Sequence, residues 1–322
     1  MYLLSILVLL SRLRHTKTMP ELPEVQTVVS ELNKRIVGRK IKRVAVNMGK
    51  IISIGPQTVS NIRDTSQKTV NEFVRLLQGR KFTSVRRRGK MLIFDINGPL
   101  SMLVHLKMTG QLIYRHGHRI IEGGHNLPVF TEKDLPTKYT LVIWKFNDGG
   151  QLYFNDMRKF GYLKIVDKEE KEKIVAKYGI EPLTKNFTLA NFRKVLGKRK
   201  TSIKAVLLNQ ALVAGIGNIY ADEICFAAGI RPDSSVAKMG EVDIKKVFTA
   251  SEAILKKAIA HKGTTFRDYV NAHGGKGNFT DFLKVYQRDG EKCLRCKKGI
   301  ITKNKTAGRG SHYCPACQKM LT

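Results

Sequence analysis

Residues 293–317 read CLRCKKGIITKNKTAGRGSHYCPAC and hold four of the five cysteines in the chain. Two residues separate Cys293 from Cys296 and Cys314 from Cys317, and seventeen residues lie between the pairs. Each pair can form a tight knuckle, and two knuckles place four thiolates around one tetrahedral Zn²⁺ ion. Because four cysteines leave no position open for water, the pattern predicts a structural zinc ion. The alternative is that the four cysteines are unpaired surface residues. In that case the two Cys-x-x-Cys spacings would have arisen by chance.

The cysteine pairs lie in a basic environment. The chain carries 58 Lys and Arg against 26 Asp and Glu, a net charge of +32, so a polyanion is the expected partner: nucleic acid first, an anionic membrane second. Paired cysteines at metal spacing favour a reducing compartment over a disulfide framework. The fifth cysteine, Cys225, is predicted to be a buried helix residue. Contact with phosphate is predicted for the ribbon residues Lys292, Arg295, Lys297, Lys298, Lys303, Lys305 and Arg309.

The sequence between residue 40 and the cysteines changes from strand to helix periodicity. From about residue 168 it is helical, with predicted helices at 188–200, 202–215, 218–229 and 241–263. From about residue 40 to residue 166 short alternating runs predict strands, at 81–96, 100–114, 139–146 and 151–156. The sequence NDGG at 147–150 predicts a hairpin turn between the last two. Many short strands indicate a sandwich or a barrel.

A helix is predicted directly after the sequence MPE at residues 19–21. Its first turn contains Pro23 and its end lies at Gly38. One face carries the apolar residues Val25, Val28, Val29, Leu32 and Ile36. The first eighteen residues begin with an apolar run that is too short to span a bilayer and lacks the features of a signal peptide. A misassigned start is favoured there over a leader or anchor.

A turn with two glycines is predicted in the sequence AGIGN at residues 214–218. Gly215 and Gly217 precede a predicted helix, and Asn218 is a good N-cap. Free N–H groups at such a turn can hold a phosphate, whereas tight helix packing explains the glycines equally well. The basic sequence KRKTSIK just upstream favours phosphate.

Several motifs occur together in one order: MPELPEV, RRRGKMLIF, HLKMTGQL, FNDMRKFG, KTSIKAVLL, AGIGNIYADEICFAAGI, GTTFRDYVNAHGGKGNF and GRGSHYCPACQ. With these motifs the chain resembles the formamidopyrimidine-DNA glycosylase family of bacterial base-excision repair enzymes, from Met19 to about Lys319. The resemblance implies an α+β multidomain chain: a β-sandwich domain with flanking helices at 19–166, a helix–two-turn–helix domain at 167–284 and a zinc finger at 285–319. Residues 1–18 lie outside it.

The resemblance also implies a reaction. Family members excise oxidised purines such as 8-oxoguanine and formamidopyrimidines, and then cleave the strand by β,δ-elimination. The nucleophile is the amine of an N-terminal proline, which here is Pro20. An α-amine titrates near pH ~8, so a fraction is neutral at physiological pH. A proline inside a chain is an amide and cannot attack, so Met19 would be the true start; the alternative for the Met-Pro pair is a harmless entry into a helix.

Three further residues match the family's catalytic positions. Glu21 would be the acid/base beside the sugar, although a carboxylate there also suits a helix N-terminus. Lys90 matches a lysine that assists catalysis, with plain phosphate binding as the alternative. Arg309 matches the zinc-finger arginine that holds the phosphate of the everted nucleotide, with a solvated charge as the alternative.

Other residues match positions that contact DNA in the family. An everted base leaves a hole in the helix, and the residues that fill it correspond to Met108, Arg158 and Phe160. Without the resemblance, Met108 and Phe160 would be expected in the core. Lys200 and Asn218 match phosphate contacts.

Two departures affect these assignments. A histidine that contacts DNA in the family is Tyr139 here, in the sequence KYTLV (138–142). The usual Asp-Gly of the flexible loop over the base is His273-Gly274, so base preference could differ.

Rival functions stay open at this point. An endonuclease VIII-like enzyme for oxidised pyrimidines is the nearest. A non-catalytic DNA-binding protein is another, if Pro20 is not the mature N-terminus. A basic membrane-surface protein rests on residues 1–18 alone. We expect a monomer in the bacterial cytoplasm, associated with the nucleoid, that binds damaged double-stranded DNA.

Overall fold

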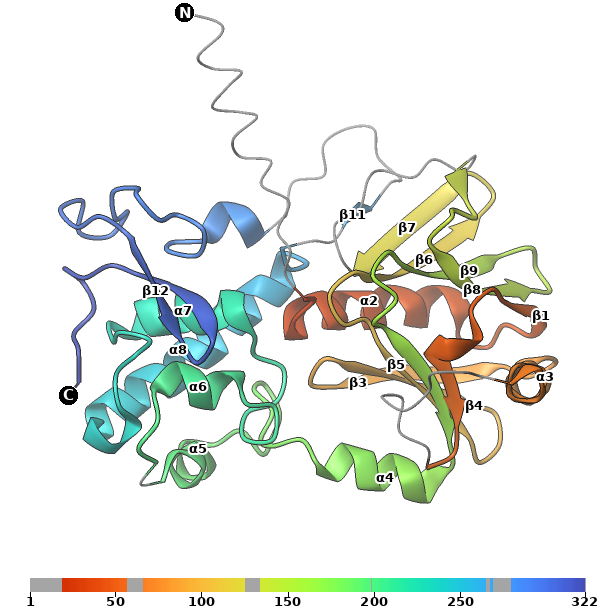
Figure 1. Cartoon of the computed structure of the whole chain (residues 1–322), viewed down its shortest axis with the longest axis horizontal. Helices are drawn as coiled ribbons and strands as arrows, with labels where there is room; N and C mark the ends of the chain where they lie inside the picture. Colours follow the sequence, from red (N-terminus) through yellow and green to blue (C-terminus); the bar gives the residue numbers. More distant parts are fainter. Residues whose placement is uncertain are drawn as a thin grey trace, which may run out of the picture.

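The fold divides into a β-rich half and a helical half that ends in a small hairpin (Figure 1). The computed structural model describes residues 19–56, 66–124, 134–197, 199–264, 267–268 and 279–321. Within these residues no helix is long and apolar enough to cross a membrane.

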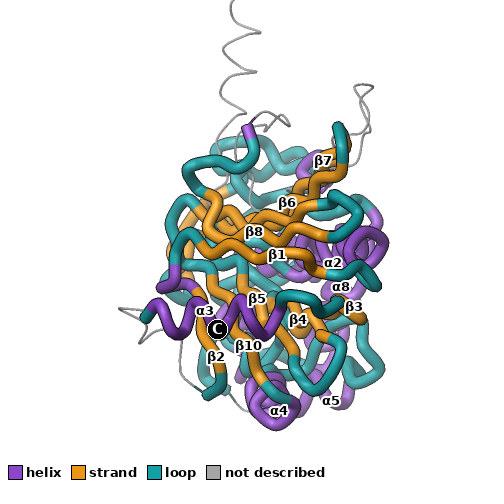
Figure 2. Tube along the Cα trace, turned by 90° about the vertical axis from the view of Figure 1, so that its right-hand side faces the viewer, coloured by secondary structure: helices purple, strands orange, loops and turns teal. Residues whose placement is uncertain are grey.

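The β-rich half is a sandwich of two sheets, which Figure 2 shows one above the other. The six-stranded sheet has the order β1 (Ile41–Val46), β8 (Thr140–Phe146), β9 (Gln151–Asp156), β6 (Gly110–His116), β7 (Arg119–Gly124) and β11 (Arg267–Asp268). The five-stranded sheet has the order β2 (Ile52–Ile54), β10 (Tyr162–Val166), β5 (Ser101–His105), β4 (Met91–Ile96) and β3 (Phe82–Arg88). The parallel pair is β2 with β10, and the other pairs are antiparallel. The predicted strands and the hairpin turn between β8 and β9 are confirmed.

Helix α2 (Leu22–Ile36) is the predicted N-terminal helix, and all five residues of its predicted apolar face are buried. It packs against β3 and β4 of one sheet, against β6 and β7 of the other, and against α8 (Glu241–Ala260) of the helical half. The helix thus joins both sheets to the second half of the molecule.

The prediction of β structure throughout residues 40–166 was wrong at one point. Helix α3 (Gln67–Leu77) lies inside that range and begins at Ser66, whose hydroxyl accepts the N–H of Thr69. It packs with Phe73 and Leu77 into the sandwich core. The helical spacing of those apolar residues and the serine cap were the signals that could have identified it.

The helical half has its own core. Its helices are α5 (Leu189–Leu196), α6 (Ile203–Leu208), α7 (Asn218–Ala228) and α8, with short 3₁₀ turns at η4 (Val236–Lys238) and η5 (Phe279–Phe282). Helix α4 (Lys168–Ala176) precedes them and packs with Ile174 and Val175 against the five-stranded sheet, and a further turn, η1 (Gly49–Ile51), lies in the sandwich. Helix α6 is shorter than predicted, because the chain turns at Asn209, whose carbonyl accepts the N–H of Leu212 at 2.9 Å. The C-terminal hairpin pairs β12 (Thr302–Thr306) with β13 (Arg309–Tyr313). The domain boundaries given above stay predictions.

Candidate active site

The first turn of α2 meets the first turn of α7 where the two halves of the molecule join. Glu21 caps α2 and is only 2% exposed. Its carboxylate accepts hydrogen bonds from the N–H groups of Gly217 at 2.7 Å and Ile219 at 2.9 Å. The positive end of the α7 dipole therefore faces a buried carboxylate. The sequence left open that the N–H groups of this turn bind a phosphate. In the structure Glu21 accepts those of Gly217 and Ile219.

The glycines of this turn are required by space. A Cβ on Gly217 would lie 2.4 Å from Cδ of Glu21 and 2.6 Å from Nζ of Lys90. Gly215 has φ +99°, and a Cβ there would lie 2.6 Å from Cδ1 of Leu22. Gly217, rather than the predicted Asn218, is the N-cap of α7, because Asn218 is already helical and its side chain points elsewhere. Tight packing therefore accounts for both glycines.

Lys90 stands beside Glu21. It lies in the turn between β3 and β4 and is 8% exposed. Burial raises the pKa of Glu21 to about 7, and the nearby Lys90 partly opposes that shift. Burial also lowers the pKa of Lys90, while Glu21 raises it and Arg309 lowers it. A carboxyl group that titrates near neutrality beside a buried amine suits proton transfer at physiological pH.

Glu24 braces the site, and the sequence analysis did not identify it. Its carboxylate accepts the N–H of Glu21 at 2.9 Å, the hydroxyl of Tyr220 at 2.6 Å and the N–H of Thr264 at 2.8 Å. Three segments thus converge on one side chain that is 2% exposed. The signal was the glutamate three residues after Glu21, which is the spacing of a capping box.

Glu181 braces the turn that carries Lys90, and it too was missed. It accepts the N–H of Gly89 at 2.7 Å and forms ion pairs with Arg87 and Arg88. Arg88 also donates to the carbonyls of Tyr178 and Gly179. The chain that links the two halves therefore holds the turn that carries Lys90. Nothing in the local sequence pairs residue 181 with residues about ninety positions earlier.

The hairpin with Arg309 is held against the same helices. Nδ2 of Asn218 donates to the carbonyl of Gly310 at 3.1 Å, and Nζ of the fully buried Lys204 donates to it at 2.9 Å. Asp222 of α7 pairs with Lys204 and accepts the N–H of His312 at 2.9 Å. Arg309 itself is exposed. After burial, the charge of Arg309 is a smaller cause that lowers the pKa of Lys90.

The four-cysteine cluster has the geometry of a zinc site. Cys293 and Cys317 have their sulfur atoms 3.6 Å apart, Cys296 and Cys314 have theirs 3.8 Å apart, and all four lie within 4.8 Å of one another. Zn–S bonds of about 2.3 Å in a tetrahedron require sulfur atoms roughly 3.8 Å apart, so this donor set fits Zn²⁺. A Cβ on Gly299 would lie 2.6 Å from Sγ of Cys314, which explains the glycine beside the first knuckle.

Met108, Arg158 and Phe160 lie together in the structure. Nη1 of Arg158 contacts Sδ of Met108 at 3.0 Å, and its guanidinium lies 4.6 Å from the centre of the Phe160 ring. Phe160 is 54% exposed, so the expectation of a core residue, drawn without the resemblance, does not hold for it. The three side chains come from two separate loops, β5–β6 and β9–β10.

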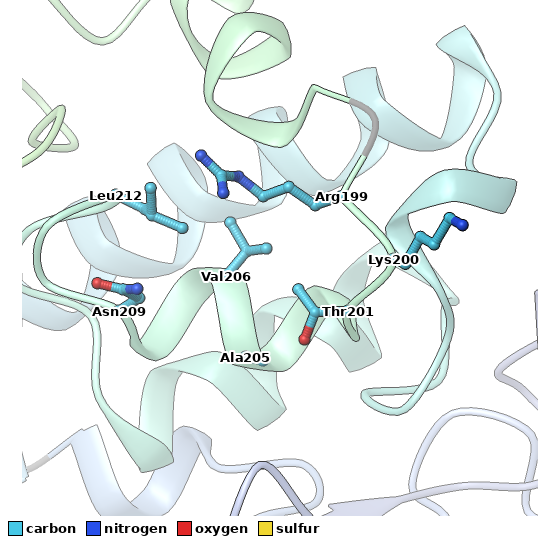
Figure 3. Close-up of a pocket in the computed structure, with 7 residues that line it drawn as sticks. All are labelled: Arg199, Lys200, Thr201, Ala205, Val206, Asn209 and Leu212. Atoms are coloured by element: carbon cyan, nitrogen blue, oxygen red, sulfur yellow. The ribbon is translucent and has the colours of Figure 1, made fainter.

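The remaining predicted residues are more scattered. Pro20 is buried directly before Glu21. Lys200 lies between α5 and α6 and is exposed. It lines a cavity of about 410 Å³ (Figure 3), and no other predicted site residue is among the described residues that line this cavity. Tyr139 lies under Nζ of Lys138, 5.3 Å from the ring centre. His273, Gly274 and residues 1–18 lie outside the described residues.

Two more residues near Lys90 and Glu21 went unpredicted. His105 lies at the end of β5, and burial together with Lys107 and Lys90 holds its pKa well below the ordinary value, so its ring is neutral. Tyr286 is 5% exposed, and burial raises its pKa to about 12. A neutral imidazole and a phenol can form hydrogen bonds without adding charge.

Comparison with known proteins agrees with this arrangement along nearly the whole chain. Residues 19–163 match the formamidopyrimidine-DNA glycosylase N-terminal domain, residues 178–270 match the H2TH domain of the same family, and residues 290–319 match the zinc finger found in FPG and IleRS. The cysteine geometry and the last match together identify a structural zinc site.

Individual proteins extend the comparison. The formamidopyrimidine-DNA glycosylase of Listeria innocua is 40% identical over 303 residues, which cover 94% of this chain and all of the relative, and that of Desulfitobacterium hafniense is 38% identical over 93% of this chain and all of the relative. A Lactococcus lactis FPG mutant bound to DNA that contains Fapy-dG superposes with a TM-score of 0.76 at 34% identity, covering 93% of this chain and all of that one. The chain belongs to the formamidopyrimidine-DNA glycosylase family.

Proposed function

We propose that the protein is a bifunctional DNA glycosylase and abasic-site lyase of base-excision repair that removes oxidised purines. The observation that carries the proposal is the buried carboxylate of Glu21, which directly follows Pro20 and lies beside the buried Lys90. Solved relatives from Lactococcus lactis are complexes with DNA containing Fapy-dG and with DNA containing an abasic site. The net charge of +32 supplies the attraction for a polyanion.

The chemistry begins with the secondary amine of Pro20. The neutral amine attacks C1′ of the damaged nucleotide, the base departs with its bonding electrons, and an iminium forms. Glu21, which titrates near pH 7, supplies and removes the protons that opening of the sugar ring requires. Lys90, buried beside Glu21, is the second ionisable side chain that we place at the reacting sugar. Arg309, on its exposed hairpin turn, holds the phosphate whose departure completes the second elimination.

The proposal requires that Pro20 be the mature N-terminus. Residues matched by the family begin at 19, and a relative from Listeria innocua is covered over its full length by 94% of this chain. Translation from Met19 and removal of that methionine would expose the amine. We therefore propose residues 1–18 as a misassigned start or a removed leader.

Covalent trapping tests the nucleophile. The protein beginning at Pro20 is mixed with duplex DNA containing 8-oxoguanine and reduced with borohydride, which converts the iminium to a stable adduct. Pro20→Gly is expected to lose most trapping and strand cleavage while it still binds DNA. Full activity of that variant would refute the assignment. The intact mass of the protein from its own host provides the control: a mass that includes Met1 would favour the non-catalytic DNA-binding alternative.

The choice of lesion is a separate test. Excision of 8-oxoguanine and of an oxidised pyrimidine is compared in the same duplex sequence. Faster excision of the purine supports the proposal, and the reverse order supports the endonuclease VIII-like alternative. We also propose that the protein works as a monomer at the nucleoid in the cytoplasm.

A further inference from the structure

Asp156 is a buried carboxylate that the proposed chemistry does not use. It lies at the end of β9 with 0% exposure. Oδ1 accepts the hydroxyl of Thr109 and the N–H of Arg158, the latter at 3.1 Å. Oδ2 accepts the N–H of Phe160 at 2.9 Å and that of Gly161 at 2.6 Å. One carboxylate thus collects four donors from two loops.

The two loops that Asp156 joins are those that carry the exposed cluster of Met108, Arg158 and Phe160. Thr109 directly follows Met108, and its hydroxyl also accepts the N–H of Arg158 at 3.0 Å. The donors to Asp156 are three main-chain N–H groups and one hydroxyl, all of them uncharged. The carboxylate therefore fixes the backbone of both loops, and leaves their side chains free to project.

Both loops contain strained backbone. Lys107, next to Met108, has φ +51°, and Lys159, between Arg158 and Phe160, has φ +58°. A non-glycine residue in this region is uncommon and persists where surrounding contacts impose it. Phe160 is too exposed for packing to impose the shape of its loop, whereas the hydrogen bonds to Asp156 act directly on that backbone.

We propose that Asp156 is a positioning residue that holds the Met108 and Arg158–Phe160 loops in one arrangement, so that the three side chains enter the DNA helix as one unit. The inference rests on the proposed function, in which these side chains fill the space left by the everted base. Asp156 acts through the loops and does not touch the reacting atoms.

The test begins with a measurement that needs no chemistry. The protein is bound to a duplex with a stable abasic analogue and a neighbouring 2-aminopurine, whose fluorescence rises when the base is unstacked. Asp156→Asn replaces one acceptor oxygen with an NH₂ group that faces N–H donors, so the fluorescence rise is expected to fall by at least about half, because two bonds to a charged acceptor are lost. An unchanged rise overturns the inference, as does the absence of any rise with the unsubstituted protein.

A rate comparison separates positioning from general damage. Asp156→Asn is expected to slow excision from duplex DNA by roughly tenfold to a hundredfold, and to change cleavage of an abasic site in single-stranded DNA by less than about threefold, because a single strand has no gap to fill. Equal losses on both substrates overturn the inference. If the unsubstituted protein cleaves neither substrate, the proposed function fails, while the fluorescence result still decides the role of Asp156.

Thr109 offers a matched pair of variants in case Asp156→Asn does not fold. Thr109→Val removes the shared hydroxyl and keeps the shape, whereas Thr109→Ser keeps the hydroxyl. The valine variant is expected to show the same selective loss on duplex DNA, and the serine variant to restore the unsubstituted rate. Equal behaviour of the two variants contradicts the inference.

Discussion

The carboxylate of Glu21 accepts the N–H of Gly217 at 2.7 Å, across 196 positions of sequence. This contact joins the residue after the predicted nucleophile to the first turn of α7. It also brings the carboxylate next to Lys90, since a Cβ on Gly217 would touch both side chains. Burial of Glu21 where the two halves of the molecule meet raises its pKa to about 7.

Gly217→Ala is expected to disable the site without unfolding the protein. The added methyl group would displace Glu21 and Lys90, so we expect excision to fall by about a hundredfold or more, the effect of misplacing a catalytic group by roughly 1 Å. Single-turnover excision measures the loss. Gly240→Ala is the control, because a Cβ there meets nothing within 4 Å and φ is −82°. Similar activity of the two variants would contradict the assigned geometry.

The excision rate is expected to pass through a maximum near neutral pH. Attack requires a neutral amine on Pro20, a form that increases as the pH rises toward ~8. Ring opening requires the protonated form of Glu21, which is lost as the pH rises through about 7. Glu21→Gln cannot titrate, so its profile is expected to lack the fall at high pH and its rate to be about 10²- to 10⁴-fold lower. A fall that persists in this variant would assign the basic limb to another group.

Lys90→Met is expected to move the basic limb to higher pH. Lys90 lowers the pKa of Glu21, so removing its charge lets that pKa rise, and Glu21 stays protonated further into the basic range. The pH profile of the residual excision rate measures the shift. Lys42→Met, at an exposed position of β1, serves as the control and is expected to leave the limb in place. A limb that does not move, or that moves to lower pH, would contradict the coupling.

Removal of the zinc site is expected to weaken DNA binding. Cys296→Ala leaves three ligands for Zn²⁺, so we expect the metal to be lost and the β12–β13 hairpin with Arg309 to lose its fixed shape. Metal content and the dissociation constant for damaged duplex are measured together. Cys225→Ala removes a cysteine on α7 outside the cluster and is expected to retain the metal. Unchanged zinc and affinity in Cys296→Ala would contradict the structural role.

Much of the fold follows from short-range patterns. The period of Val25, Val28 and Leu32 specifies α2, and the sequence NDGG specifies the turn between β8 and β9, because both depend on residues a few positions apart. Helix α3 was overlooked since it lies within a run of strands. The end of α6 at Leu208 depends on the turn that follows, where the apolar pattern continues without a helix.

The sequence by itself determined the zinc ligands, the N-terminal helix and, through its resemblance, the family and the candidate catalytic residues. Spacing within one segment is enough for a metal knuckle or a helix face. Only the tertiary structure decided that the N–H groups at Gly217 and Ile219 hold Glu21, that Glu24 and Glu181 brace the site, and that Asp156 joins two loops. Each of these carboxylates meets donors from distant segments, and its burial, which makes those hydrogen bonds strong, exists only after the segments have packed.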